Sequence, residues 1–254
     1  MSNKLLPQDG QIQRVLNKPG EPAWKQYAHL AVGRPSRWAL LRYEFLTGCF
    51  GNWPGAAGYW LRRKTYGRLF ASMGAGAIIG RNVVIRGADR IRLGRGVAID
   101  DNVVLDARDA DGAIEIGDGA LISRNTIVRA RNGMIKIGEK ADIGANCLLA
   151  TDSRLEVGRQ VLIAAYTYVC AGGNHICSRT DVPILEQGLA QKDGIVIEDD
   201  VWLGAYTMVL DGVRIGTGTV IGAHSLVNKS LPARSLAWGQ PARRRKERGA
   251  TATT

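Results

Sequence analysis

The sequence predicts an all-β solenoid, and three observations lead to this prediction. An aliphatic residue recurs every six residues near the C-terminal end, at Ile197, Leu203, Val209, Ile215, Ile221 and Val227. Neither the helical period of 3.6 residues nor the strand period of 2 explains this spacing, whereas a fixed short repeat is typical of a solenoid. The chain also holds 32 glycines against 8 prolines, which suits many tight corners between short strands.

Each six-residue unit is interpreted as one short strand and one tight corner, so that three units close a triangular coil. The aliphatic side chains point into the prism, and stacked coils bury a core that one coil could not bury alone. Earlier triplets continue the pattern at Leu93/Ile99/Leu105, Ile116/Ile122/Val128, Ile137/Ile143/Leu149 and Val157/Ile163/Val169. Successive triplets are 23, 21 and 20 residues apart where a bare coil would take 18, so a few extra residues are expected to bulge from one corner of each coil. We expect about six coils, roughly 30 Å tall at about 4.8 Å per layer.

The repeat stops for 27 residues between Val169 and Ile197. A long insertion without a repeat in a compact domain is usually functional, and this one contains His175, one of three histidines in the chain. The predicted organisation is therefore a helical extension over residues 1–77 and a β-solenoid over 78–238 with an inserted loop at 170–196. A basic C-terminal segment and tail follow over 239–254.

The N-terminal extension is basic and rich in tryptophan. Residues 1–77 hold eleven Lys or Arg and three acids, and so contribute +8 of the formal net charge of +11. They also hold four of the six tryptophans. After a polar lead to about residue 25, one helix is expected to start at the cap residue Ser36, with Trp38, Leu41 and Phe45 on one face. A second is expected from about Tyr59 to Met73. Basic amphipathic helices with Trp and Phe suit an anionic membrane surface. The alternative is that they only cap the first open coil.

Other global features point to a cytosolic protein. The four cysteines have no metal-ligand spacing, and Cys147 occupies a small-residue position of the repeat that predicts a buried free thiol. Nothing indicates disulfides, so a reducing cytosol is expected. No apolar run of 18 residues or more is present, and the N-terminus lacks an apolar signal-peptide core. Peripheral association with the cytosolic face of a membrane is compatible with all of this.

The repeats, together with Gly239-Gln240-Pro241-Ala242-Arg243, resemble the hexapeptide-repeat acyltransferase family over roughly residues 79–243. The resemblance implies a left-handed parallel β-helix, a handedness opposite to the usual crossover, and a homotrimer that binds acetyl-CoA between neighbouring prisms. Residues 54–66 (PGAAGYWLRRKTY) are similar to the extension of O-acetyltransferases of bacterial surface polysaccharides.

Acetyl transfer to a hydroxyl needs a base near neutral pKa, for which histidine is suited. The family supplies it from an Asn-His or His-x-His near the start of such a loop, and Gly173-Asn174-His175 matches that pattern. The alternative is a loop histidine without a role. His29 and His224 are expected to be structural or exposed, and Asp181 or Glu186 is a candidate to orient His175.

The resemblance also implies positions for the two substrates. Backbone groups at Ala205 and Ala223 would line the pantetheine arm, although corners favour small residues in any case. Lys229, Arg243 and Lys246 would meet the CoA phosphates, with a solvated basic tail as the alternative. On the acceptor side, Asn146 matches a residue that contacts the sugar, and Asp152 is a weaker candidate. A corner asparagine with positive φ is the alternative explanation for Asn146.

The leading functional prediction is a CoA-dependent O-acetyltransferase that acts on a saccharide or lipid-linked saccharide in surface polysaccharide or lipopolysaccharide biosynthesis. N-acetyl transfer to an amino-sugar or an antibiotic is the alternative within enzymes. A non-enzymatic basic scaffold for membranes or nucleic acid is the alternative of another class, but no nucleic-acid module is recognisable. No metal is expected, because the three histidines lack ligand spacing and so argue against a hydratase-like metalloenzyme of the same fold.

Overall fold

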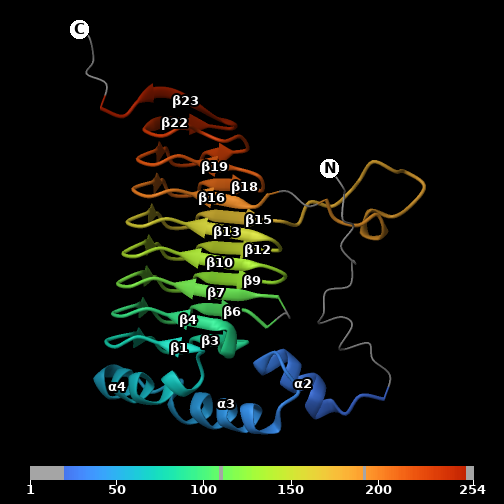
Figure 1. Ribbon diagram of the computed structural model, residues 1–254, viewed down its shortest axis with the longest axis vertical. Helices are drawn as coiled ribbons and strands as arrows, with labels where there is room; N and C mark the ends of the chain where they lie inside the picture. The colour runs from blue at the N-terminus through green and yellow to red at the C-terminus, as the bar shows by residue number, and fades with distance from the viewer. Residues whose placement is uncertain (1–19, 109–110, 191–192, 250–254) are drawn as a thin grey trace.

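The computed structural model describes residues 20–108, 111–190 and 193–249, and these form a triangular prism of stacked coils with three helices at one end. Every strand pairs in parallel with the strand one coil above or below, except for an antiparallel hairpin at the top. The fold is the left-handed parallel β-helix that the sequence predicts. Figure 1 shows the stack with the helices below it.

The three sheets form the three faces of the prism. Face 1 consists of β1 (Ser72–Met73), β4 (Ile91–Leu93), β7 (Ala113–Ile116), β10 (Met134–Ile137), β13 (Arg154–Val157), β16 (Ile195–Ile197) and β19 (Arg214–Ile215). Face 2 consists of β2 (Ile78–Ile79), β5 (Ala98–Ile99), β8 (Leu121–Ile122), β11 (Asp142–Ile143), β14 (Leu162–Ile163), β17 (Trp202–Leu203), β20 (Val220–Ile221), β22 (Ser235–Gly239) and β23 (Ala242–Glu247). Face 3 consists of β3 (Val84–Arg86), β6 (Val104–Asp106), β9 (Ile127–Ala130), β12 (Leu148–Thr151), β15 (Tyr168–Ala171), β18 (Met208–Leu210) and β21 (Leu226–Val227).

The described residues form seven coils rather than the expected six or so, because β1 completes a coil with β2 and β3 below the triplet that starts at Leu93. Each aliphatic residue of the six-residue repeat is buried inside the prism. The slot two residues before the aliphatic residue of face 3 holds valine in the two lowest coils. In the five coils above, it holds a Thr, Ser or Cys that donates to a corner carbonyl, as Thr207 Oγ1 does to Gly204 O at 2.6 Å. Cys147 occupies one of these slots as a buried free thiol, as predicted.

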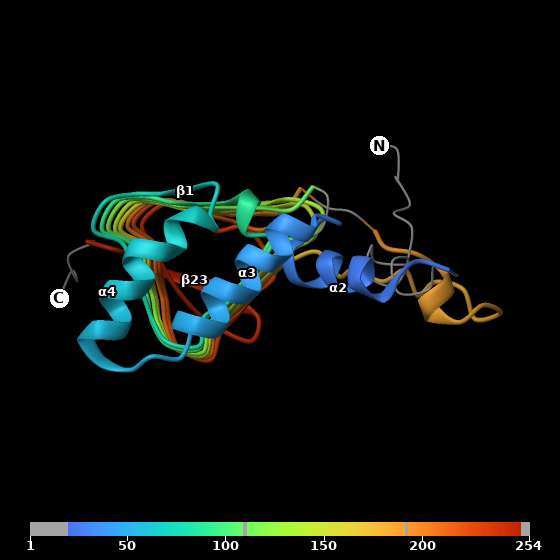
Figure 2. The ribbon, with the colours of Figure 1, turned by 90° about the horizontal axis from the view of Figure 1, so that it is seen from below.

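The helices α3 (Arg37–Phe50) and α4 (Gly55–Thr65) lie across the lower end of the prism, and α2 (Ala23–Val32) lies beside it next to β3 and α3 (Figures 1 and 2). Ser36 caps α3 as predicted, since its Oγ accepts a hydrogen bond from Ala39 N at 3.3 Å. The second helix was expected to run to Met73, but it ends at Thr65. A 3-10 turn, η1 (Tyr66–Arg68), follows it, and the chain then enters β1. Two further 3-10 turns are η2 (Ala88–Arg90) and η3 (Ile184–Glu186).

The helix α2 was not expected, because residues to about 25 were predicted to be a polar lead and the first helix was predicted to start at Ser36. Residues 1–19 of that lead lie outside the described residues. Among the described helices, none combines the length and the apolar character needed to cross a bilayer.

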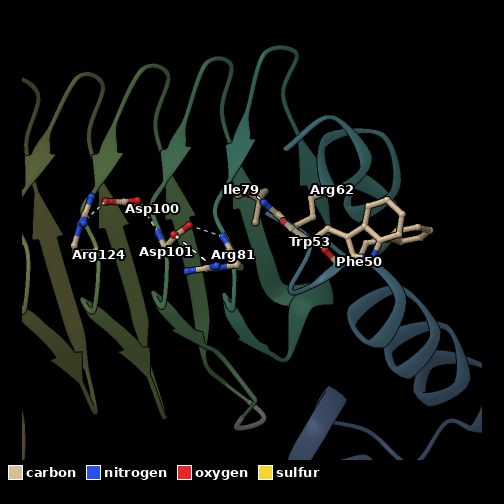
Figure 3. Close-up of polar contacts among 8 residues, drawn as sticks. All are labelled: Phe50, Trp53, Arg62, Ile79, Arg81, Asp100, Asp101 and Arg124. Atoms are coloured by element: carbon tan, nitrogen blue, oxygen red, sulfur yellow. Dashed lines mark hydrogen bonds and ion pairs between the residues drawn. The ribbon is translucent and has the colours of Figure 1, made fainter. Parts of the chain in front are cut away.

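Arg62 joins the helical cap to the first coil (Figure 3). Its side chain is 1% exposed and donates from Nε to Ile79 O at 2.8 Å and from Nη1 to Phe50 O and Trp53 O at 3.0 and 2.8 Å. Backbone carbonyls from the end of α3, the following loop and β2 are thus satisfied by one guanidinium, a rigid group with five donors. Salt bridges between successive coils, such as Arg124 to Asp100 at 3.1 Å, lie at the surface instead and contribute little.

We therefore expect Arg62→Met to lower the free energy of unfolding by about 2–4 kcal/mol, because it leaves buried carbonyls without a donor. Chemical denaturation followed by circular dichroism measures the change. Arg63→Met is the matched control, since Arg63 is the next residue on the same helix and is exposed. Equal stability of the two variants would contradict this account of the cap.

Candidate functional site

One corner of the prism, between faces 2 and 3, carries a column of residues with left-handed backbone (the 2/3 corner). From bottom to top the column is Asn82, Asn102, Asn125, Asn146, Tyr166, Tyr206 and His224, with φ between 54° and 61°. Asparagine tolerates this conformation, whereas a bulky side chain adopts it rarely and at a cost. The change from asparagine to aromatic residues in the upper three coils therefore marks a local strain that is typical of functional sites.

The three aromatic rings stack along the corner. The ring centroids of Tyr166 and Tyr206 are 4.8 Å apart and nearly parallel, and those of Tyr206 and His224 are 4.7 Å apart. All three side chains are exposed. Ala205 and Ala223 immediately precede Tyr206 and His224, and the backbone N–H of His224 donates to Ala205 O at 2.9 Å.

The structure thus brings three of the predicted substrate-binding positions, Asn146, Ala205 and Ala223, onto one edge. Sequence reasoning missed Tyr166 and Tyr206. Their signal is an aromatic residue in a slot that holds asparagine in the lower coils.

The closing hairpin lies above the same corner. Gln240 Nε2 donates to His224 O at 2.9 Å, which holds the turn between β22 and β23 over the aromatic column. Arg243, at the start of β23, pairs with Trp238 close to that turn, whereas Lys246 pairs with Leu236 farther along the strand. Arg245 lies with its guanidinium 5.9 Å from the Trp238 ring and is a further basic residue that the sequence analysis did not select.

The corner between faces 3 and 1 (the 3/1 corner) carries the long loop. It leaves β15 after Ala171, projects from the prism and returns at Ile195 to start β16 (Figure 1). His175 is exposed in this loop. The base of the loop is a short antiparallel pairing in which Ile176 N donates to Gly188 O at 3.0 Å and Ala190 N donates to Asn174 O at 2.8 Å.

A buried carboxylate anchors the loop beside His175. Asn174 Nδ2 donates to Asp211 Oδ2 at 2.6 Å, and Asp211 is 6% exposed. Its second oxygen, Oδ1, has no hydrogen-bond partner within the described part of the chain. Asp181 does not fill this orienting role, because its carboxylate pairs with Arg179 at 2.6 Å. Asp211, which the sequence analysis did not select, is the acid that contacts the residue next to His175.

Asp152 lies under the start of the loop rather than beside Asn146. Gly172 has a φ of 138°, and a Cβ added there would come within 2.8 Å of the Asp152 side chain, so only glycine fits this close approach. Lys229 follows β21 at the same 3/1 corner, in the last coil, and is exposed. Within one chain the predicted residues therefore form two groups, one at each corner, and face 3 separates them.

The outer surfaces of the three faces differ in character. On face 3 every coil presents an apolar side chain to the outside: Val84, Val104, Ile127, Leu148, Tyr168, Met208 and Leu226. From β2 to β20 face 2 also presents apolar side chains, except for Asp142: Ile78, Ala98, Leu121, Leu162, Trp202 and Val220. Above them, β23 adds the exposed basic residues Arg243, Arg244, Arg245 and Lys246. Face 1 is charged and presents Arg92, Glu115, Lys136, Glu156 and Arg214. Arg86 and Arg129 also point outward from face 3, but only in the lower coils. Beside the aromatic column the outward side chains of β14, β15, β17 and β18 are uncharged, and contiguous exposed apolar surface indicates an interface.

Among the residues that the structure describes, no group of three or more His, Cys, Asp and Glu side chains is placed to hold a metal ion.

Comparison with known proteins agrees with the fold and the repeat. Residues 194–229 match the model of the family described as bacterial transferase hexapeptide (six repeats). A putative colanic acid biosynthesis acetyltransferase, WcaF of Escherichia coli, is 32% identical over 129 residues, which cover 49% of this chain and 67% of the relative. A probable acetyltransferase of Mycobacterium tuberculosis is 34% identical over 162 residues, which cover 64% of this chain and only 51% of that protein.

Among solved structures, AntD, an N-acyltransferase from Bacillus cereus in complex with dTDP and 3-hydroxybutyryl-CoA, superposes with a TM-score of 0.51. It is 22% identical, and the match covers 74% of this chain and 88% of AntD. This likeness concerns the fold. The sequence repeat, the seven-coil β-helix and the match to WcaF together show that the chain belongs to the bacterial hexapeptide-repeat transferase family.

Proposed function

We propose that this protein is a CoA-dependent O-acetyltransferase that transfers the acetyl group of acetyl-CoA to a hydroxyl of a saccharide. The observation that carries the proposal is an exposed histidine on a loop that a buried carboxylate anchors, in a β-helix of the transferase family. The name of the WcaF relative, which refers to colanic acid biosynthesis, supports a saccharide acceptor used in surface polysaccharide or lipopolysaccharide biosynthesis. Free thiols and the use of acetyl-CoA fit the cytosolic location that the sequence predicts.

The proposed site needs two chains, because His175 and the aromatic corner lie at different edges of one prism. A cyclic trimer joins two different surfaces of each subunit. Face 3 connects the 2/3 corner to the 3/1 corner and presents an apolar side chain in every coil, so it is suited to face the rotation axis, with the 2/3 corner of one chain against the 3/1 corner of the next, while the charged face 1 stays in water. In such a trimer the loop of one chain would lie over the aromatic corner of its neighbour.

Acetyl-CoA would lie along the 2/3 corner in this arrangement. The small side chains of Ala205 and Ala223 leave the backbone open to the pantetheine arm. Arg243 and Lys246 in the closing hairpin would meet the phosphates, and Lys229 would reach them from the neighbouring chain because it lies at the 3/1 corner. Asn146 lies lower on the same edge and would offer its amide to the acceptor, with Asp152 of the neighbouring chain on the opposite side.

In the reaction, neutral His175 would accept the proton of the acceptor hydroxyl while the hydroxyl oxygen attacks the thioester carbonyl carbon. The tetrahedral adduct would then collapse, the C–S bond would break, and the protonated imidazole would return the proton to the departing thiolate. The hydrogen bond from Asn174 to the buried Asp211 would hold the loop, and with it His175, in place.

His175→Ala is expected to lower kcat by about 10²–10⁴-fold, which is the contribution of a positioned general base. Acetyl transfer to an acceptor panel is followed by the release of free CoA thiol, with hydroxyl and amino sugars both in the panel. His29→Ala is the control, because His29 lies in α2 at the base of the prism. Retention of more than about a tenth of kcat, with chemistry limiting the rate, would refute the assignment.

Asp211→Ala should loosen the loop, because a hydrogen bond to a buried carboxylate stabilises by about 1.5–3 kcal/mol. Hydrogen exchange at the amide of Ala190 should accelerate at least about tenfold, and kcat should fall while KM for acetyl-CoA stays the same. Asp181→Ala, which removes an exposed ion pair of the same loop, serves as the control. Unchanged exchange in Asp211→Ala would show that the loop is held by other contacts.

Co-expression tests whether each site is shared between chains. His175→Ala lacks the base and Ala205→Trp blocks the groove, so trimers of either variant alone should be inactive. In a random mixture, about one site in four combines an intact loop with an intact neighbouring corner, and roughly a quarter of the wild-type activity should return. A mixture that stays inactive, with trimers verified by light scattering, would place base and groove on the same chain.

Combined replacement of Lys229, Arg243 and Lys246 by Ala should raise KM for acetyl-CoA by about two- to fivefold per residue, since each is a solvent-exposed charge contact. The value of kcat should change less. Paired substitution of Arg92 and Lys136 on face 1 provides the control. An unaltered KM in the triple variant would show that these basic residues do not contact CoA and are only solvated.

A further inference from the structure

The helix α3 is apolar on two opposite sides. Ala39, Tyr43 and Leu46 are buried on the side that faces the prism. Trp38, Leu41 and Phe45 are 83%, 60% and 63% exposed on the outer side. Packing on the prism explains the inner stripe but not the outer one. Within the described chain nothing covers these three large side chains.

Basic side chains surround the outer stripe. Residues 20–77 hold eight Lys or Arg against two acids, and one of these acids, Glu44, accepts a hydrogen bond from Tyr27 at 2.6 Å. Arg37 and Arg42 flank the stripe on α3, and Lys64 is exposed on the neighbouring helix α4. Arg63 of α4 lies instead beside Ile78 and Leu121 at face 2. In the described part of the chain, Arg42 and Lys64 have no ion-pair partner. We call Arg37, Arg42 and Lys64 together with Trp38, Leu41 and Phe45 the basal patch.

We propose that the basal patch docks the protein on an anionic lipid bilayer, with the prism axis upright. An aromatic and aliphatic stripe bordered by arginine and lysine is the chemistry that inserts shallowly among headgroups and attracts anionic lipids. The flat arrangement of the helices across the end of the prism favours a planar partner (Figures 1 and 2).

Symmetry strengthens this choice of partner. In the proposed trimer, on which this step rests, the rotation axis runs along the prisms and places three basal patches in one plane. A bilayer can engage all three at once, so weak individual contacts add to a strong one. A second trimer placed base to base would bring like charges together and is the competing occupant that the experiment separates.

Upright docking sets the height of the proposed site above the lipid. The loop with His175 leaves β15 in the fifth coil, four layers above the first. At about 4.8 Å per layer, plus about 10 Å for the helices, His175 stands roughly 30 Å above the headgroups. The acceptor hydroxyl would therefore belong to a lipid-linked saccharide long enough to reach this height, and not to the lipid-proximal sugar.

Vesicle flotation of the full-length protein tests the docking surface. Binding to vesicles of phosphatidylglycerol and phosphatidylcholine is expected at low salt, with weak binding to phosphatidylcholine alone. Combined W38S, L41S and F45S should weaken binding at least about tenfold. Replacing Arg42 and Lys64 by Gln should weaken it about fivefold per residue. Combined I184S and L185S, which remove exposed apolar side chains of the loop, form the matched control and should bind as the wild type does.

The native cysteines report the orientation. Cys49 is exposed on α3, four residues after Phe45 and hence on the same side of the helix, while Cys177 is exposed in the loop. An environment-sensitive fluorophore on Cys49 of Cys177→Ser should shift to the blue on anionic vesicles. The same label on Cys177 of Cys49→Ser should not respond.

Three results would overturn the proposal: no binding by the wild type, equal binding by the W38S/L41S/F45S protein, or a hexamer in light scattering that this variant splits into trimers. The last result would assign the patch to a second copy. Acetyl transfer to a soluble acceptor is measured in parallel and should persist in the patch variants, so that failure of docking and failure of the proposed chemistry remain distinguishable.

Discussion

The burial of one aliphatic side chain per corner-to-corner strand is the constraint on which the whole structure depends. A single coil of three short strands encloses too little apolar surface to be stable, so each coil relies on the coils above and below. The two ends of the stack therefore need covers of another kind. The antiparallel hairpin of β22 and β23 covers the top, and the helices α3 and α4 cover the base.

The helical cover at the base of the prism depends on a buried polar residue. The open first coil and the loop after α3 leave carbonyls that face inward and have no strand to pair with. One buried guanidinium, that of Arg62, donates to three of them and so ties α4 to β2 and to the end of α3. A lysine offers a compact ammonium and not a planar fork, so it would not match this spread of acceptors as well.

The regularity of the prism also explains where function can be placed. The stacked registers leave little freedom on the faces, so variation is confined to corners. At the 2/3 corner, two tyrosines and a histidine adopt the left-handed backbone conformation at an energetic cost, and their rings stack in a column. At the 3/1 corner, the repeat opens into the loop that carries His175, and Asp211 of the next coil holds the loop through Asn174. The two corners flank an apolar face, and for this reason the proposed reaction and the proposed assembly depend on each other.

Much of the fold was determined by the sequence alone, because a repeat of six residues with inward aliphatics admits few structures. The β-helix, the inserted loop and its histidine, the cap of α3 at Ser36 and the buried Cys147 were all predictable from local pattern. The added first coil and the early end of α4 were not. Met73 stands six residues before Ile79, but a methionine at the end of an apolar helical pattern does not identify a strand, and its place in the stack comes from pairing with Leu93 of β4.

The tertiary structure determined which residues become neighbours in space. Asp152 and Asn146 are six residues apart in the sequence, yet they lie at different corners, because the coil turns between them. Asp211 and Asn174 are 37 residues apart and meet because one full coil separates them. The outer stripe of α3 looks like an ordinary core stripe in the sequence. Only the packing of its other side against the prism leaves Trp38, Leu41 and Phe45 facing outward.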